Sequence, residues 1–307
     1  MHYTVMKNES IDGLNLKDDG IYVDCTLGYA GDSSEILKWI KKGFLFAFDQ
    51  DSDAIKYSQQ VLKQIGNNFE IIKSNFLYMK EELEKRNIKK VDGILFDLGV
   101  SSPQLDTRER GFSYHLDAKL DMRMDKDNKL SAYEVVNDYS EKDLARIIFT
   151  YGEEKYAKSI ARNIVKERDK KKIETTQELV DIIKKSMPYK DTINHHPARR
   201  TFQAIRIEVN HELDILSDSL RKGLDMLNVG GRMVVISFHS LEDNIVKKIF
   251  NEYSKENDFV RGMPNVPKEY LPDFKVINHK PITASDDELK ENNRSRSAKL
   301  RIIERIK

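Results

Sequence analysis

The chain has 307 residues, of which 39% are hydrophobic and 34% charged, and its formal net charge at pH 7 is +1. This length allows one large domain or two unequal ones, and the composition is that of a soluble globular protein. No apolar run approaches the roughly 20 residues of a membrane span, and the first residues lack the apolar core of a signal peptide. We therefore expect a cytoplasmic protein without membrane contact. The single cysteine excludes an internal disulfide and a cysteine-rich zinc site.

The first predicted elements are a strand, a glycine turn, a helix and a second strand. The strands cover residues 21–25 and 44–49, the helix covers 33–40, and the second strand ends in Asp49. This order is the opening βαβ unit of a nucleotide-binding sheet, in which the terminal acid binds the ribose hydroxyls. The pattern therefore predicts an adenosine-containing ligand in contact with Asp49.

The start of the first helix indicates which adenosine compound binds. A pyrophosphate needs bare backbone amides and a favourable helix dipole there. In this chain Asp32 occupies that place, and Ala30 replaces the glycine that lets a pyrophosphate approach. An acid repels phosphate but tolerates the ammonium of a methionine tail, which favours S-adenosylmethionine over NAD. Asp32 also begins an Asp-Ser-Ser-Glu capping box, so an N-cap role stays open beside a ligand contact.

Two further strands, 69–73 and 93–97, continue the alternation with helices. This alternation predicts a parallel sheet covered by helices on both faces. The strand 93–97 ends in Asp97 and is followed by Leu-Gly-Val-Ser-Ser-Pro-Gln-Leu-Asp. Open α/β sheets bind ligands at this carboxyl edge. Asp97 and the loop after it are therefore candidate site residues.

After Asp106 the strand signal disappears until about residue 200, and helices with capping boxes at Ser140 and Thr175 take its place. We predict a helical insertion over 106–200, for substrate recognition, in a sheet domain made of 1–105 and 201–307. Eight Lys or Arg against two acids lie in 155–172, and six against one acid in 294–307. Such clusters attract phosphate, although each is also typical of a solvated helix face.

The sheet domain resumes with one long predicted helix. Its apolar positions have helical spacing and are assigned to the core: Phe202, Ile205, Val209, Leu213, Leu216 and Leu220. A strand at 232–238 and two more at 275–279 and 300–306 complete seven strands. A sheet whose last strand turns back beside its neighbours is common among methyltransferases and unusual among dehydrogenases.

Several motifs along nearly the whole chain are specific to one family. They are Asp97 to Asp106, Glu-Arg-Gly-Phe-Ser-Tyr from Glu109, Leu-Asp-Met-Arg-Met-Asp from Leu120, His-Pro-Ala-Arg-Arg from His196, Ser-Phe-His-Ser-Leu-Glu-Asp from Ser237 and Asn-Arg-Ser-Arg-Ser-Ala-Lys-Leu from Asn293. In these motifs the sequence resembles the ribosomal RNA small subunit methyltransferase H family, also called MraW. The resemblance implies an α/β fold, a Rossmann-like seven-stranded methyltransferase sheet interrupted by a helical insertion domain. It also implies methylation by S-adenosylmethionine of the exocyclic N4 amine of a cytidine in the decoding centre of 16S ribosomal RNA, in the small ribosomal subunit.

The resemblance further implies which residues bind the cofactor. They correspond here to Ala30, Gly31, Asp32, Asp49, Phe76, Asp97 and Gln104. Phe76 is expected at the end of the third strand, where its ring covers the adenine. The family usually has Gly-Gly-His where this chain has Ala30-Gly31-Asp32, which leaves the contact made by Asp32 open.

Methylation of a cytosine amine needs an acceptor that draws on the amine hydrogens, and Asp97 is the candidate for that role. The alternative is an acid that only binds the cofactor or fixes its loop. His239 is the second catalytic candidate, against a structural role, and Phe238 and Ser240 join it in a pocket for the flipped base. Substrate contacts are further assigned to Ser102, Pro103, Arg110, His196, Arg199 and Arg200. His195 and His196 lack metal-ligand spacing and a nearby cysteine, so no metal is expected.

The sequence leaves three other functions open. A dehydrogenase would need a pyrophosphate loop, which Asp32 and the absence of Gly-x-Gly-x-x-Gly oppose. A non-catalytic RNA-binding protein would not need both strand-end loops, and DNA is distinguished from RNA only by the family resemblance. The sequence leaves the oligomeric state open, a homodimer included.

Overall fold

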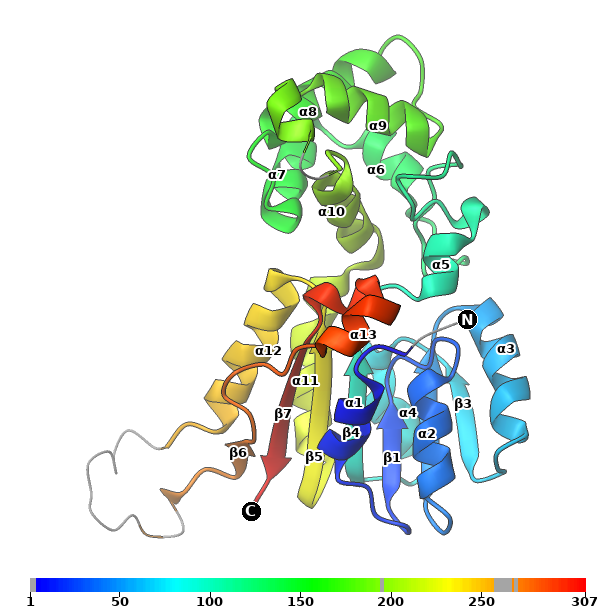
Figure 1. The fold of residues 1–307 in the computed structure, drawn as a ribbon, viewed down its shortest axis with the longest axis vertical. Helices are drawn as coiled ribbons and strands as arrows, with labels where there is room; N and C mark the ends of the chain where they lie inside the picture. Colours follow the sequence, from blue (N-terminus) through cyan, green and yellow to red (C-terminus); the bar gives the residue numbers. More distant parts are fainter. Residues whose placement is uncertain (1–3, 194–195, 257–266, 268–269) are drawn as a thin grey trace. The chain divides into compact units, whose positions relative to one another are not determined.

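The protein is described by a computed structural model that covers residues 4–193, 196–256, 267 and 270–307. It divides into two compact units, which are a sheet unit of Met1–Gly99 and Leu213–Lys307 and a helical unit of Val100–Glu212 (Figure 1). The predicted insertion, 106–200, lies within the helical unit, whose bounds extend to Val100 and Glu212.

The sheet unit contains seven strands in the order β3-β2-β1-β4-β5-β7-β6. The first five pair in parallel, whereas β7 is antiparallel to both β5 and β6. The predicted seven-stranded Rossmann-like sheet with a reversed last strand is therefore confirmed. The strands are β1 (Ile21–Asp24), β2 (Phe44–Asp49), β3 (Phe69–Lys73), β4 (Val91–Asp97), β5 (Leu227–Ser237), β6 (Phe274–Val276) and β7 (Lys299–Arg305).

Apolar side chains on both faces of the sheet explain why helices cover both. Consecutive strand residues point to opposite faces, so Leu95 and Phe96 of β4 belong to different apolar clusters. The cluster with Leu95 includes residues of α1 (Lys7–Leu14), α2 (Gly31–Trp39) and α3 (Ser52–Lys63). The cluster with Phe96 includes residues of α4 (Met79–Lys85), α11 (Glu212–Met226) and α12 (Ser240–Tyr253). Near the chain's end, α13 (Asp286–Glu291) and the 3-10 helix η6 (Asn293–Ser297) precede β7.

The helical unit has an apolar core of its own, built mainly from the inner faces of its longer helices. The predicted N-caps are confirmed, because the Ser140 and Thr175 side chains accept the amides of Asp143 and Glu178. The helices are α5 (Ser102–Asp106), η2 (Arg108–Arg110), α6 (Ala132–Asp138), α7 (Glu141–Gly152), α8 (Ala157–Arg168), α9 (Thr176–Lys185), η3 (Tyr189–Thr192) and α10 (Arg199–Asn210). None of the helices in the described ranges has both the length and the apolar character that a bilayer span requires.

The prediction of one long helix from Phe202 to Leu220 is wrong. His211, at a φ of 53°, separates α10 from α11. At the end of α10 the Asn210 side chain donates to Met122 O at 2.9 Å and accepts the Met124 amide at 2.8 Å. The helix therefore stops where its last side chain is used to bind a loop. Beyond the break Leu213 is only partly buried, whereas the other five predicted core positions are buried.

Candidate functional site

The glycine loop after β1 is fixed to the end of β2. Asp49 Oδ2 accepts the Gly28 amide at 2.8 Å, and Asp49 Oδ1 accepts the Asp51 amide at 2.8 Å. Each carboxylate oxygen accepts one of these bonds and has a further lone pair for a ligand hydroxyl. Burial raises the pKa of Asp49 to about 6, against the opposing effect of these amides. Asp49 is therefore a pre-positioned acceptor at the carboxyl edge of the sheet, where the sequence predicts ribose.

Helix α2 begins differently from the sequence prediction. Its N-cap is Ala30, at a φ of 62°, and Gly31 is the first helical residue. Asp32 lies inside the first turn and is 6% exposed, so the N-cap role is wrong. Asp32 Oδ1 accepts no hydrogen bond from any described residue. Burial, followed by the charges of Asp97 and Asp24, raises the pKa of Asp32 well above its usual range.

Asp97, at the end of β4, also has a carboxylate oxygen that accepts no hydrogen bond from a described residue. Its backbone amide donates to Thr26 Oγ1 at 2.7 Å, which joins the β4 end to the loop after β1. Its Oδ1 atom is buried and has no donor within the part of the chain that the structure describes. Burial raises the pKa of Asp97 to about 8, and the charges of Asp24 and Glu242 add to the effect.

The third carboxylate of this group, Asp24, is satisfied by neutral donors. Ser33 Oγ donates to Asp24 Oδ2 at 2.6 Å, and the Thr26 amide donates to Oδ1 at 3.0 Å. Over the described ranges no Lys or Arg forms an ion pair with Asp24, Asp32 or Asp97. Buried carboxylates without a cation are costly. This edge of the sheet therefore favours the binding of a positively charged ligand.

The segment after β5 lies next to the loop after β4. The Leu98 amide donates to Ile236 O at 3.0 Å, and a Cβ on Gly99 would lie 3.4 Å from the Phe238 ring. The Phe238 amide donates to Glu242 Oε2 at 2.8 Å, and His239 Nε2 lies 3.0 Å from Glu242 Oε1. Glu242 is not among the candidate residues predicted from the sequence, although its place one turn after His239, the N-cap of α12, is a usable signal.

Phe76 is not at the end of the third strand. The strand ends at Lys73, and Phe76 begins the short helix η1 (Phe76–Tyr78). Its ring packs edge-on against the Phe96 ring, with 5.5 Å between centroids. An aromatic contact with β4 therefore positions Phe76 on the face of the sheet that carries Phe96.

The remaining predicted cofactor residue, Gln104, belongs to the helical unit together with Ser102 and Pro103. These residues form α5, whose N-cap is Ser101. The Gln104 side chain is buried and accepts the Ser101 amide at 3.0 Å as part of a capping box. This box gives Gln104 a local structural role, and Ser102 and Pro103 form the first turn that it stabilises.

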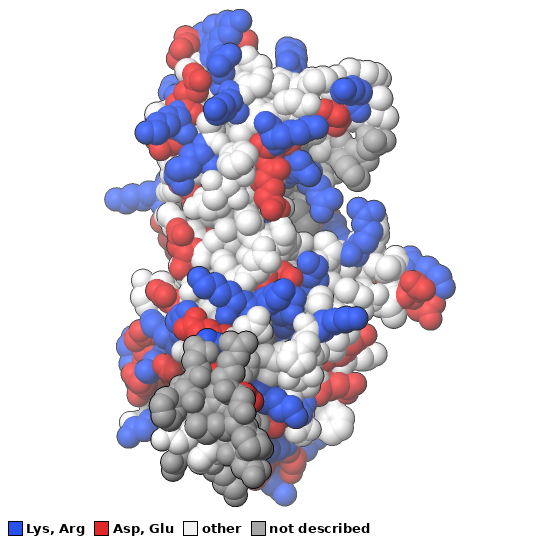
Figure 2. Space-filling model, turned by 90° about the vertical axis from the view of Figure 1, so that its left-hand side faces the viewer, with Lys and Arg blue, Asp and Glu red and all other residues white. Residues whose placement is uncertain are grey.

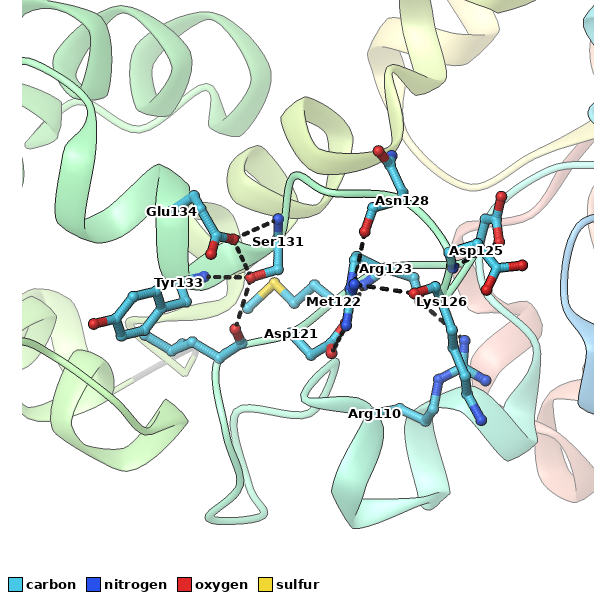
Figure 3. A network of polar contacts seen from close by, with 12 residues as sticks. Arg110, Asp121, Met122, Arg123, Asp125, Lys126, Asn128, Ser131, Tyr133 and Glu134 are labelled. Atoms are coloured by element: carbon cyan, nitrogen blue, oxygen red, sulfur yellow. Dashed lines mark hydrogen bonds and ion pairs between the residues drawn. The ribbon is translucent and has the colours of Figure 1, made fainter.

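Arg110 is buried rather than directed to a substrate. It is 7% exposed, and its Nη2 donates to the carbonyl oxygens of Arg123 and Met124 at 2.9 and 3.1 Å. Arg123 in turn donates to both carboxylate oxygens of Asp121 and to Asn128 O. Figure 3 shows these side chains converging on one loop. The geometry favours a structural role for Arg110 in shaping this loop.

The predicted RNA residues of the motif from His196 lie at the start of α10 and just before it. Arg199 and Arg200 are exposed in its first turn and form no ion pair within the described chain. His196 stacks on Tyr114 at 4.4 Å between centroids.

The basic run 155–172 is largely neutralised by neighbouring acids. Over the helical unit, the upper part of the view in Figure 2, basic and acidic side chains are interspersed. The ion pairs join Lys155 to Asp191, Arg162 to Glu141, Lys170 to Glu167, Lys171 to Glu178 and Lys172 to Asp138. In the run 294–307, Lys299 and Arg301 bind Asp243. These contacts favour the structural interpretation of both runs.

Comparison with known proteins identifies the family. A model of the MraW methylase family matches residues 1–306. The chain belongs to this family. Ribosomal RNA small subunit methyltransferase H of Exiguobacterium sibiricum is 57% identical over 307 residues, which are 100% of this chain and 98% of the relative. The family predicted from the motifs is therefore confirmed.

Two solved structures resemble this MraW methylase family member at low identity. One is an rRNA methylase from Streptococcus thermophilus, with a TM-score of 0.46, 12% identity and coverage of 100% of this chain and 99% of the other. The second is a Streptococcus mutans protein in complex with SAH, with a TM-score of 0.43, 13% identity and coverage of 99% of both chains.

Proposed function

We propose that this protein transfers a methyl group from S-adenosylmethionine to 16S ribosomal RNA, at the N4 amine of a cytidine in the decoding centre. The observation that carries the proposal is the pair of buried oxygens Asp32 Oδ1 and Asp97 Oδ1, which have no donor among the described residues. The activity takes place in the cytoplasm, where the small ribosomal subunit is made. The family and the name of the Exiguobacterium relative support a ribosomal RNA substrate.

The charge of the site fits S-adenosylmethionine better than a dinucleotide. Three buried carboxyl groups would repel a pyrophosphate, whereas an ammonium and a sulfonium compensate them. Asp32 and Asp97 are assigned to these two cations, Ala30 and Gly31 to the turn beside them, and Asp49 to the ribose. Phe76 covers the adenine, and Gln104 completes the predicted cofactor contacts. The bound cofactor supplies a methyl group on a positively charged sulfur.

The chain's contribution to the chemistry is to orient the attacking amine. The nitrogen lone pair of cytosine N4 is delocalised into the ring, so an acceptor must bind an amine hydrogen to direct the lone pair at the methyl group. Asp97 is the acceptor at the β4 end, and His239 with Phe238 and Ser240 forms the pocket for the base. The amine becomes positively charged on methylation and then loses a proton readily. Positioning therefore supplies most of the rate.

The helical insertion, residues 106–200, recognises the RNA in this proposal. Its exposed Arg199 and Arg200 have no ion-pair partner in the described chain and are available to phosphates. His196 lies just before them and is partly exposed, as are the predicted contacts Ser102 and Pro103, which precede the insertion in α5.

The test is methyl transfer from labelled S-adenosylmethionine to small-subunit RNA that lacks the modification. Free 16S RNA and assembled small subunits are offered in parallel, and the labelled nucleoside is identified by mass spectrometry after digestion. We expect N4-methylcytidine at a single position. Label in another nucleoside contradicts the N4 assignment, and absence of label in both substrates contradicts the proposed activity. Calorimetric titration with NAD is the control for the ligand, and we expect no binding.

A further inference from the structure

We propose that the helical unit carries a stacking platform for single-stranded RNA, formed by the rings of Tyr114, His115 and His196. The inference rests on the proposed function, because it names a surface of the helical unit that binds the RNA substrate. It concerns binding at the helical unit and does not involve the carboxylates of the sheet unit.

The three rings contact one another. The centroid of Tyr114 lies 4.4 Å from that of His196, with an angle of 21° between the planes, and 4.5 Å from that of His115. The two imidazole centroids are 5.0 Å apart. Phe202 of α10, 3% exposed, supports the group from the core side, with its ring edge-on to Tyr114 at 5.7 Å. The rings thus form a supported cluster rather than independent side chains.

The outer part of this cluster is accessible. His115 is exposed, and Tyr114 and His196 are each partly exposed. Burial and the neighbouring His115 and Lys184 lower the pKa of His196, which favours the neutral form of its ring. A neutral imidazole and a phenol present flat π-faces, on which nucleobases stack without regard to sequence.

Three exposed cations belong to the same helical unit as the rings. Lys184, which is close enough to affect His196, is exposed, as are Arg199 and Arg200, and none of the three forms an ion pair within the described ranges. The Arg199 amide donates to His196 O at 3.1 Å, which ties the start of α10 to the platform. The basic run 155–172 is different, because five of its cations are paired with acids.

Rings and free cations together match the chemistry of single-stranded RNA. Phosphates are attracted by the unpaired Lys and Arg, and unstacked bases are bound by the rings. A protein partner of acidic character would use the cations but would gain little from imidazole faces. We therefore assign the surface to RNA.

The experiment measures binding of a labelled single-stranded RNA of about 16 nucleotides, the upper end of the site sizes known for folds that bind single strands, at several salt concentrations. We expect His115→Ala and Tyr114→Ala to weaken binding about 5-fold to 100-fold, as loss of one stacked base does. Tyr114→Phe retains the ring and should bind as the unaltered protein does. Phe149→Ala removes a 66% exposed ring of α7 outside the platform and is the matched control.

Two further variants separate stacking from charge. Arg199→Glu with Arg200→Glu should reduce the dependence of the RNA Kd on salt, whereas the ring variants should leave that slope unchanged. Because Trp39 is the only tryptophan, His115→Trp in a Trp39→Phe background places a single fluorophore on the platform. We expect RNA to quench its fluorescence.

Equal RNA affinity of the folded ring variants and the unaltered protein overturns the platform, as does failure of the unaltered protein to bind RNA. Methyl transfer by the unaltered protein decides the proposed function separately. RNA binding that depends on the rings, without methyl transfer, would support the platform and refute the proposed methyltransferase activity. Methyl transfer with ring-independent binding would do the reverse.

Discussion

The Asp49 carboxylate accepts the backbone amide of Gly28 across 2.8 Å, although 21 positions separate the two residues. This bond joins the end of β2 to the glycine loop after β1. Ser58 of α3 strengthens the connection, since its hydroxyl donates to Gly28 O at 2.8 Å. These two hydrogen bonds therefore hold the acid assigned to the ribose in a fixed position relative to the loop assigned to the methionine part of the cofactor.

Asp49→Ala should weaken S-adenosylmethionine binding by about 1.5–3 kcal/mol, the range for a charge-assisted hydrogen bond. The variant should remain folded, because the sheet does not depend on this carboxylate. Calorimetric titration measures the Kd, and Asp53→Ala, an exposed acid at the start of α3, is the matched control. An unchanged Kd in the folded variant would refute the assignment.

Asp32→Asn should stabilise the ligand-free protein and weaken cofactor binding. The pKa of Asp32 is raised by burial, so its folded-state carboxyl keeps a proton that the unfolded chain has already lost. Its contribution to stability is present below the unfolded pKa and is lost as pH rises through the folded value. The gain should therefore be larger at pH 8 than at pH 5, and each 1 kcal/mol of it raises Tm by roughly 2–4 °C. Thermal unfolding at both pH values decides this, with Glu35→Gln on the same helix as control.

Asp97→Asn distinguishes the two roles left open for this residue. If Asp97 only fixes the loop or the cofactor, turnover and cofactor affinity should fall in proportion. If it orients the amine, kcat at saturating cofactor should fall far more than the Kd rises, because that interaction matters most in the transition state. We expect the second result. Near-normal turnover at saturating cofactor would remove Asp97 from the catalytic residues.

Cofactor affinity should rise with pH. The pKa of Asp97 is raised to about 8 by burial and by the neighbouring charges of Asp24 and Glu242. A bound cation favours the ionised carboxyl, so binding below that pH releases a proton and costs affinity, up to about tenfold per pH unit. Titrations between pH 6 and pH 9 measure the slope. It should flatten in Asp97→Asn and for S-adenosylhomocysteine, which lacks the sulfonium charge. A flat profile for S-adenosylmethionine with the unaltered protein as well would contradict the assignment of Asp97 to a cation.

Arg110→Ala should destabilise the helical unit rather than act on RNA directly. The substitution leaves the carbonyl oxygens of Arg123 and Met124 without this donor, which costs about 1–3 kcal/mol. Thermal unfolding should show the loss, while the Kd for S-adenosylmethionine stays unchanged. Arg162→Ala, whose side chain is 73% exposed, is the control. A variant of full stability that binds RNA weakly would restore the predicted substrate contact.

The sequence by itself determined the sheet and the order of its elements. Apolar runs that end in Asp24, Asp49 and Asp97 predict the parallel strands, since buried strands need continuous apolar faces and their ends meet at one edge. The Ser140 and Thr175 caps were equally readable, because a cap and its amide are only three positions apart. The family motifs were readable in the same way, as local patterns.

Only the tertiary structure decided which charged side chains are free. Asp32 has the pattern of an N-cap, yet the turn at Ala30 starts the helix earlier and buries it without a donor in the described chain. Arg110 and the run 155–172 have the composition of an RNA surface, but Arg110 and most of that run find partners. The spacing of residues along the sequence does not reveal such partners, because each carbonyl or acid is brought close only when the chain folds. The helix break at His211 has the same origin, since Asn210 is engaged by Met122 and Met124 from a distant loop.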